Sequence, residues 1–268
     1  MTQWIVDVVG DGYGQALPVE DILYDRPSPY QRVQVVTSPL YGRMLVLDDA
    51  VQTTERDEHV YHEMLAHVPM AIHPAPRQVL IIGGGDGGTL EEVLKHPVEQ
   101  ATMVEIDRDV VEVSRAFLPA IAGAAFEDRR TRLLIDDGIA FVRHTAERFD
   151  VVLVDSTDPK GPGVALFSEE FYRLCRRVLS PHGVIAAQSG SLLYQRELVA
   201  MVARHLRSVF PFVAPYWAAI PAYPGTLWTF TLATLDAPPP APRALALPGL
   251  RYYTPAVHQA AFAIPPVP

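Results

Sequence analysis

The chain has 268 residues, of which 49% are hydrophobic and 20% charged, and a formal net charge of −9 at neutral pH. This composition predicts a globular protein with enough chain to bury a substantial core, and its acidic balance argues against nucleic acid as a partner while it tolerates cationic ones. No apolar run reaches the roughly 18 residues of a membrane span, the N-terminus does not resemble a signal peptide, and the single cysteine, Cys175, cannot form an intrachain disulfide, so we expect a cytoplasmic protein with no membrane partner.

In chain order, the first 60 residues are rich in predicted β-structure. Residues 31–38 and 43–48 have the composition of strands and are joined by Pro-Leu-Tyr-Gly, which predicts a hairpin. Residues 5–14 resemble a strand followed by a glycine loop, but Pro18 soon follows and no acid-ending second strand lies at the right distance. We interpret this segment as a turn. The sequence thus predicts a small N-terminal β domain at residues 1–60.

After this domain, strands alternate with helices at the spacing of βαβ units, which predicts an α/β domain at residues 61–268 with a mostly parallel, Rossmann-like sheet flanked by helices. The expected strands are residues 79–82, 101–104, 131–135, 151–155, 184–188, 213–220 and 227–232, and the expected helices are residues 89–96, 139–147, 168–179 and 192–210. Cys175 falls in one of these helices and is expected in the core. Pro-His-Gly at residues 181–183 should separate a helix from the next strand, and three prolines at residues 238–240 open an irregular tail.

His62 and His67 lie in a segment that resembles the helix of a zinc protease. Their offset of five residues places them about 140° apart around a helix, so they do not share one face. We therefore expect no zinc site at this pair.

The apolar strand at residues 79–82 runs directly into Gly-Gly-Gly-Asp-Gly-Gly at residues 83–88. Glycines in this place permit a tight turn and the close approach of a nucleotide-type ligand to the backbone. Asp86, in the middle of the loop, would repel a phosphate or a ligand carboxylate and favour a cation. The loop therefore indicates a positively charged nucleoside.

Further acids follow the next two predicted strands. Glu105 lies about 20 residues past the glycine loop, where an acid commonly binds ribose hydroxyls. Asp137 could accept a hydrogen bond from the exocyclic amine of adenine. The alternative for each acid is capping of the helix that follows.

Asp155 and Asp158 come at the end of the predicted strand at residues 151–155, before a loop rich in glycine and proline. Ligands of an open α/β sheet bind outside the carboxyl ends of the strands, so both carboxylates should face the nucleoside cleft. Two acids at this spacing suit an amine, because one can remove a proton while the other anchors a cation. The alternative is an Asx turn with a helix cap.

Taken together, these motifs resemble the polyamine aminopropyltransferases, the spermidine synthase family, over almost the whole chain. The likeness rests on residues 42–48, 52–58, 61–64, 83–88, 105–107, 155–163, 220–225 and 252–258. It implies transfer of an aminopropyl group from decarboxylated S-adenosylmethionine to a diamine, usually putrescine, with release of methylthioadenosine. It also implies a methyltransferase-like Rossmann domain, a small N-terminal antiparallel β domain, and a homodimer or homotetramer.

The resemblance further implies roles for individual residues. Asp155 is expected to be the base that helps deprotonate the attacking amine, with Tyr61 and Tyr223 positioning that amine. The other expected contacts form two sets, with Asp158, His62 and Gln188 at the amine acceptor and Gln34, Gln52, Asp86, Glu105, Asp137 and Gly138 at the nucleoside donor. A sulfonium leaves without metal assistance, so we expect neither a metal nor a bound cofactor beside this co-substrate.

Three alternatives stay open. The acceptor could be agmatine, cadaverine or spermidine, because the sequence does not display the depth of the pocket. A methyltransferase of the same fold would have no obvious use for Asp86 or for the pair of Asp155 and Asp158. A catalytically silent binder of polyamines or nucleosides should lose the base, whereas Asp155, Tyr61 and Tyr223 are all present.

Overall fold

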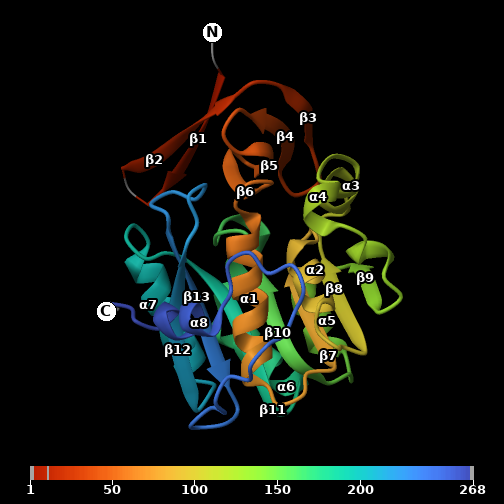
Figure 1. Ribbon diagram of the computed structural model, residues 1–268, viewed down its shortest axis with the longest axis vertical. Helices are drawn as coiled ribbons and strands as arrows, with labels where there is room; N and C mark the ends of the chain where they lie inside the picture. Colours follow the sequence, from red (N-terminus) through yellow and green to blue (C-terminus); the bar gives the residue numbers. More distant parts are fainter. Residues whose placement is uncertain (1–2, 11, 266–268) are drawn as a thin grey trace.

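The N-terminal part of the chain forms two antiparallel sheets, which lie above the larger sheet in Figure 1. The computed structural model describes residues 3–10 and 12–265. One sheet pairs β1 (Gln3–Val9) with β2 (Tyr13–Val19), and the other contains β3 (Ile22–Pro27), β4 (Arg32–Ser38), β5 (Gly42–Leu47) and β6 (Ala50–Thr54) in chain order. The predicted hairpin is confirmed as β4 and β5. Residues 5–10 and 12–14 belong to the β1–β2 hairpin, where Gly10 and Gly12 adopt positive φ angles between the two strands.

A seven-stranded, mostly parallel sheet forms the centre of the remaining chain, in the order β12-β13-β11-β10-β7-β8-β9. Its strands are β7 (Gln78–Gly83), β8 (Gln100–Glu105), β9 (Thr131–Ile135), β10 (Phe149–Asp155), β11 (Leu179–Ser191), β12 (Phe212–Ala219) and β13 (Leu227–Thr234). Only β13 runs antiparallel to its neighbours among the described pairs. The predicted fold class, a Rossmann-like sheet with a small N-terminal antiparallel β domain, is confirmed.

Helices cover both faces of this sheet because successive strand residues alternate between two hydrophobic cores. Ile81 and Leu153 belong to the core that contains residues of α1 (Glu58–Ile72) and α2 (Gly88–Leu94), whereas Leu80 and Val152 belong to the core formed with α5 (Gly138–His144), α6 (Glu169–Val178) and α7 (Arg196–Arg207). The other elements are α3 (Arg108–Phe117), α4 (Pro119–Ala122), α8 (Pro255–Ala261) and the 3₁₀ segments η1 (Ala125–Glu127) and η2 (Gly161–Phe167). Cys175 lies fully buried in the second core, as predicted. In the described ranges, no helix is both long and apolar enough to cross a membrane.

Three expectations about element boundaries are corrected. Residues 181–183 do not separate a helix from a strand, because they form a bulge within β11, with His182 at φ +65°. The helix expected from residue 192 begins at Arg196, because the Gln195 side chain accepts a hydrogen bond from the Ser191 amide and holds residues 191–195 in a turn. The irregular tail contains α8, whose first turn is capped by Thr254.

Gly83 provides a test of how tightly β7 is placed against β10. Its φ is +83°, and a Cβ atom there would lie 2.0 Å from the carbonyl oxygen of Asp155. We expect Gly83→Ala to lower the free energy of unfolding by on the order of 3 kcal/mol or more, through backbone strain and overpacking. The control is Gly249→Ala at φ +71°, where the described chain places no atom within 4 Å of the new Cβ, and we expect a loss of about 1–2 kcal/mol. If urea unfolding gave the same loss of unfolding free energy for both variants, the close approach of Gly83 to the Asp155 carbonyl would be contradicted.

Candidate functional site

The carboxyl ends of the parallel strands and the N-terminal sheets enclose a cavity of about 410 Å³. Ten of the expected site residues line it, namely Gln52, Tyr61, Asp86, Glu105, Asp137, Gly138, Asp155, Asp158, Gln188 and Tyr223. Residues far apart in the sequence are thus brought together because parallel strands end at the same edge of the sheet. His62 and Gln34 lie behind the cavity wall.

Asp155, the last residue of β10, is held by hydrogen bonds from two helices. The hydroxyl of Tyr61 in α1 donates to Oδ1 at 2.7 Å, and that of Thr89 in α2 donates to Oδ2 at 2.6 Å. Burial raises the pKa of the Asp155 carboxyl, and the neighbouring charge of Asp86 raises it further. The carboxylate is therefore fixed in orientation and is a better proton acceptor than an exposed aspartate.

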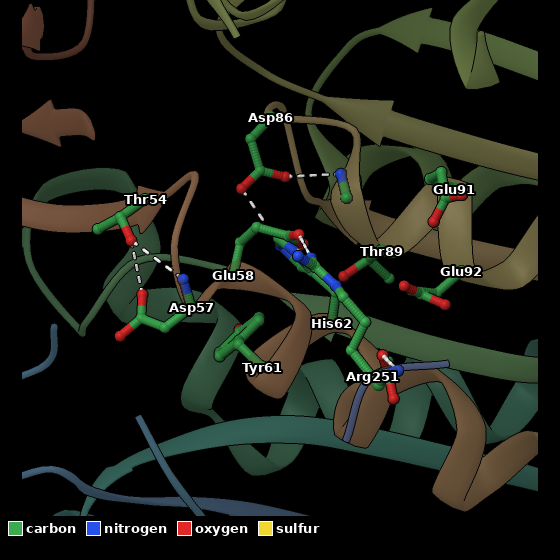
Figure 2. A network of polar contacts seen from close by, with 12 residues as sticks. Thr54, Asp57, Glu58, Tyr61, His62, Asp86, Thr89, Glu91, Glu92 and Arg251 are labelled. Carbon is green, nitrogen blue, oxygen red and sulfur yellow. Dashed lines mark hydrogen bonds and ion pairs between the residues drawn. The ribbon is translucent and has the colours of Figure 1, made fainter. Parts of the chain in front are cut away.

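Asp86 lies close to Asp155, with carboxylate oxygens of the two residues within 4.8 Å of each other. His62 holds the Asp86 side chain (Figure 2). Its Oδ1 accepts from the Gly88 amide at 2.9 Å, and its Oδ2 lies 3.3 Å from His62 Nε2. The other ring nitrogen, Nδ1, lies 2.8 Å from Glu58 Oε2. The geometry does not support the expected contact of His62 with an amine acceptor, because the ring is buried and both its nitrogens face carboxylates.

His62, Asp86 and Asp155 each offer one metal-ligand atom, and these atoms lie within 4.8 Å of one another. The described hydrogen bonds and ion pairs already engage both nitrogens of the ring and both oxygens of each carboxylate. A metal would have to displace several of these contacts. The cluster is therefore better suited to hydrogen bonds and ion pairs among its side chains than to coordination of an ion.

Tyr61 and Tyr223 form the aromatic part of the wall, with ring centroids 5.8 Å apart. The Tyr223 hydroxyl donates to the backbone oxygen of Gln52 at 2.5 Å. Burial raises the pKa of both phenols well above its ordinary value, so both hydroxyls stay protonated and act as donors. The loop that carries Tyr223 is anchored by Asp57, whose Oδ2 accepts from the Ala222 amide at 2.8 Å.

Beyond Asp155, the cavity continues to a second carboxylate. Asp158 Oδ2 accepts from Gln195 Nε2 at 2.7 Å, while the buried Oδ1 has no protein hydrogen-bond partner among the described residues. The Gln188 amide donates to the backbone oxygens of Ser156 and Thr157 at 3.0 and 3.2 Å and so shapes this loop. An unpaired carboxylate oxygen in the cavity wall is suited to accept from a ligand N–H group.

A third carboxylate, Asp7, lines the same end of the cavity and was missed by the sequence reasoning. It accepts from the Val51 amide at 2.9 Å, and burial raises its pKa to about 6. The available signal was the alternation of β1, in which Asp7 takes an inward position between Ile5 and Val9. That signal was lost because residues 5–14 were interpreted as a turn.

At the opposite end of the cavity, Glu105 and Asp137 follow β8 and β9. Glu105 Oε1 accepts from the Asp107 amide at 2.8 Å, and burial raises the pKa of its carboxyl to about 7. Asp137 Oδ1 accepts from the amides of Ile139 and Ala140, so this residue does cap α5, as the alternative interpretation stated. It nevertheless lines the cavity beside Gly138.

The glutamines of the N-terminal sheet differ from expectation. Gln34 is buried within β4, where its amide donates to Asp25 Oδ2 at 3.2 Å, so it does not reach the cavity. Gln31, just before β4, lines the cavity, and its amide donates to Asp107 Oδ2 at 3.0 Å. Gln52 lines it from β6. The expected donor contact of Gln34 is therefore not supported, and Gln31 is the better-placed residue.

Two family models match successive parts of the chain. Residues 3–55 match the spermidine synthase tetramerisation domain, and residues 58–239 match the spermine/spermidine synthase domain. The polyamine aminopropyltransferases of Desulforudis audaxviator and Moorella thermoacetica are each 44% identical to this chain, covering 99% and 98% of it and 97% and 94% of their own lengths.

Solved structures are similar over nearly the full chain. A spermidine synthase in complex with the transition-state analogue AdoDATO has a TM-score of 0.93 and 38% identity, covering 98% of this chain and 92% of its own. The spermidine synthase of Thermotoga maritima has a TM-score of 0.92 and 37% identity, covering 98% and 91%. The similarity thus holds for the three-dimensional structure as well as for the sequence, and it covers both the N-terminal sheets and the seven-stranded sheet.

The raised pKa of Glu105 predicts a pH-dependent effect of Glu105→Gln on stability. The folded chain holds the proton up to about pH 7, whereas the unfolded chain releases it near the ordinary pKa of 4.5. The free energy of unfolding of the natural protein therefore falls as the pH rises from 4.5 to about 7, and it stays at the lower value above this range, because the buried carboxylate is then charged. We expect the variant to become more stable than the natural protein by on the order of 3 kcal/mol above about pH 7, and by little near pH 4.5. Urea unfolding across this range measures the difference, and a difference that does not change with pH would contradict the assignment.

Proposed function

This chain belongs to the spermine/spermidine synthase family, the family of the polyamine aminopropyltransferases, and on that premise we propose that it moves the aminopropyl group of decarboxylated S-adenosylmethionine onto putrescine. The products would be spermidine and methylthioadenosine. The observation that carries the proposal is the row of carboxylates along one cavity, in which Asp86 is buried and Asp155 and Asp158 are partly buried. Both substrates are cations, and such a row is suited to bind both.

The donor would occupy the end of the cavity near β7, β8 and β9. Glu105 would accept from the ribose hydroxyls, Asp137 from the adenine amine, and Asp86 from the aminopropyl ammonium group. Gln31 and Gln52 would complete this end from the N-terminal sheet. Undecarboxylated S-adenosylmethionine carries an additional carboxylate, which Asp86 would repel, so the site would select against it.

Asp155 would act as the base. The acceptor ammonium gives a proton to Asp155, and the nitrogen lone pair then attacks the methylene carbon bonded to the sulfonium. The carbon–sulfur electron pair leaves with sulfur, which becomes the neutral thioether of methylthioadenosine. Tyr61 and Tyr223 flank this position and would keep the amine in line with the carbon. We propose that this reaction uses neither a metal nor a resident cofactor, because the sulfonium is already an activated leaving group.

The far nitrogen of the acceptor would meet the unpaired Oδ1 of Asp158, with Asp7 deeper in the same end. A diamine such as putrescine would present one nitrogen to Asp155 and its other nitrogen to Asp158. Equimolar putrescine, cadaverine, agmatine and spermidine, incubated with the donor and the purified protein, would reveal the preferred product by mass spectrometry. A main product other than spermidine would keep the enzyme class and overturn putrescine as acceptor, whereas donor binding without any transfer would favour a silent binder.

Asp155→Asn provides the test of the base. We expect turnover to fall on the order of 10²- to 10⁴-fold while donor affinity changes little, because the amide cannot take the proton but keeps the shape of the side chain. The exposed Asp21, remote from the cavity, supplies the control Asp21→Asn, which removes the same charge and should retain full turnover. Steady-state rates and calorimetric donor binding measure the two effects. Unchanged turnover in Asp155→Asn would remove this residue from the mechanism.

An apolar stripe on β1 would form a subunit contact in a homodimer or homotetramer. Trp4, Val6 and Val8 point outward and are 53–54% exposed, and they lie in the part of the chain that matches the tetramerisation domain. Such a row is unusual on a surface that faces only water. We expect Val6→Asp to reduce the molar mass in multi-angle light scattering to that of a smaller assembly. Val164→Asp, at an equally exposed site in η2, should leave the mass unchanged, and a natural protein that is already monomeric would overturn this contact.

A further inference from the structure

A chain of alternating charges runs from the surface to Asp86 behind the cavity wall (Figure 2). The guanidinium of Arg251, about half exposed, pairs with Glu58 Oε1. The second oxygen of Glu58 lies 2.8 Å from His62 Nδ1, and His62 Nε2 lies 3.3 Å from Asp86 Oδ2. Each member contacts the next, so the orientation of Asp86 depends on residues that do not line the cavity.

The two contacts of His62 determine its protonation state by geometry. A neutral imidazole has one N–H donor and one acceptor nitrogen, whereas the imidazolium has two donors. Both ring nitrogens face carboxylate oxygens, which can only accept when ionised. A neutral ring bonded to Glu58 through Nδ1 would point the lone pair of Nε2 at Asp86, so only the cation satisfies both partners.

The ring is also fixed mechanically. His62 is 2% exposed, and a Cβ atom at Gly88 would lie 2.2 Å from the ring. The backbone at the start of α2 therefore lies directly against the ring, which limits its rotation. A flipped or tilted ring would lose one of its two carboxylate partners.

The charges around His62 favour the same state. Glu58 faces it from α1, Asp86 from the glycine loop, Asp155 from β10 and Glu92 from α2, while Arg251 approaches from the C-terminal segment. Burial by itself would lower the pKa of His62, but Asp86 and Glu58 together raise it well above its ordinary value. An imidazolium that lies between two of these carboxylates reduces their mutual repulsion.

We propose that Glu58 is a positioning residue, which holds His62 as an imidazolium and through it fixes the Asp86 carboxylate that faces the donor. The inference rests on the proposed function for the identity of the donor. The state of His62 in the protein alone does not depend on that identity.

The first experiment uses the protein without substrate. Long-range ¹H–¹⁵N spectra, with the His62 signals assigned through His62→Gln, report the protonation of each ring nitrogen across pH. We expect both nitrogens to stay protonated in the natural protein well above neutral pH, and the ring of Glu58→Gln to become neutral at a lower pH than the ring of the natural protein. A ring that is neutral at pH 7 in the natural protein would overturn the proposal, even if the variant does not fold.

The second experiment measures donor affinity by calorimetry with decarboxylated S-adenosylmethionine. We expect Glu58→Gln to weaken binding about tenfold at a pH where the spectra show a neutral His62 in this variant and a charged one in the natural protein, and at most about twofold at a lower pH where His62 is charged in both. Equal weakening at both pH values would indicate a merely structural role and overturn the proposal.

Arg251→Gln is the matched control. It removes a charge from the same network but leaves the Glu58 carboxylate in place, so His62 should stay protonated as in the natural protein. Loss of the His62 proton in Arg251→Gln would show that any disturbance of the network removes this proton. That result would contradict the specific role of Glu58. If the natural protein transfers no aminopropyl group while the spectra behave as expected, the proposed function fails and the link from Glu58 to His62 stands.

Discussion

The crowding of buried and partly buried carboxylates at the ends of β7, β8 and β10 is the constraint on which the site depends. Ligand oxygens of Asp86 and Asp155 lie within 4.8 Å of each other, where two full charges repel by roughly 3 kcal/mol at an effective dielectric constant of about 20. The fold offsets this cost with hydrogen-bond donors fixed on α1 and α2. A cationic ligand would relieve the remaining repulsion, so the charges of this site favour cationic ligands.

Much of this architecture was predictable because parallel strands leave a strong signal. Apolar runs that end in Asp86, Glu105, Asp137 and Asp155 identify both the strands and the edge at which the acids meet, whatever the exact helix limits. The same reasoning failed where a boundary depends on one side chain, as at Gln195, which delays the start of α7.

The roles of single residues were less predictable where register decides them. Gln31 and Gln34 both belong to a segment predicted as a strand, and only the structure shows which of them reaches the cavity. Asp7 was missed because residues 5–14 were interpreted as a turn, although Asp7 lies inside strand β1. His62 was expected among the ligand contacts, since adjacency to Tyr61 does not reveal that successive helical residues point in different directions.

The turn between β12 and β13 is joined to the start of α1 by Asp57, which also accepts from Thr54 at 2.6 Å. The cavity end that we propose for the donor is built from the carboxyl ends of the parallel strands, whereas Tyr223 and Asp7, at the end proposed for the acceptor, come from the β12–β13 turn and from strand β1 of the N-terminal hairpin. Loops such as the β12–β13 turn tolerate insertion and replacement better than the ends of central strands do. Under the proposed function, such a division would allow the choice of amine to diverge among homologues while recognition of the shared nucleoside is retained.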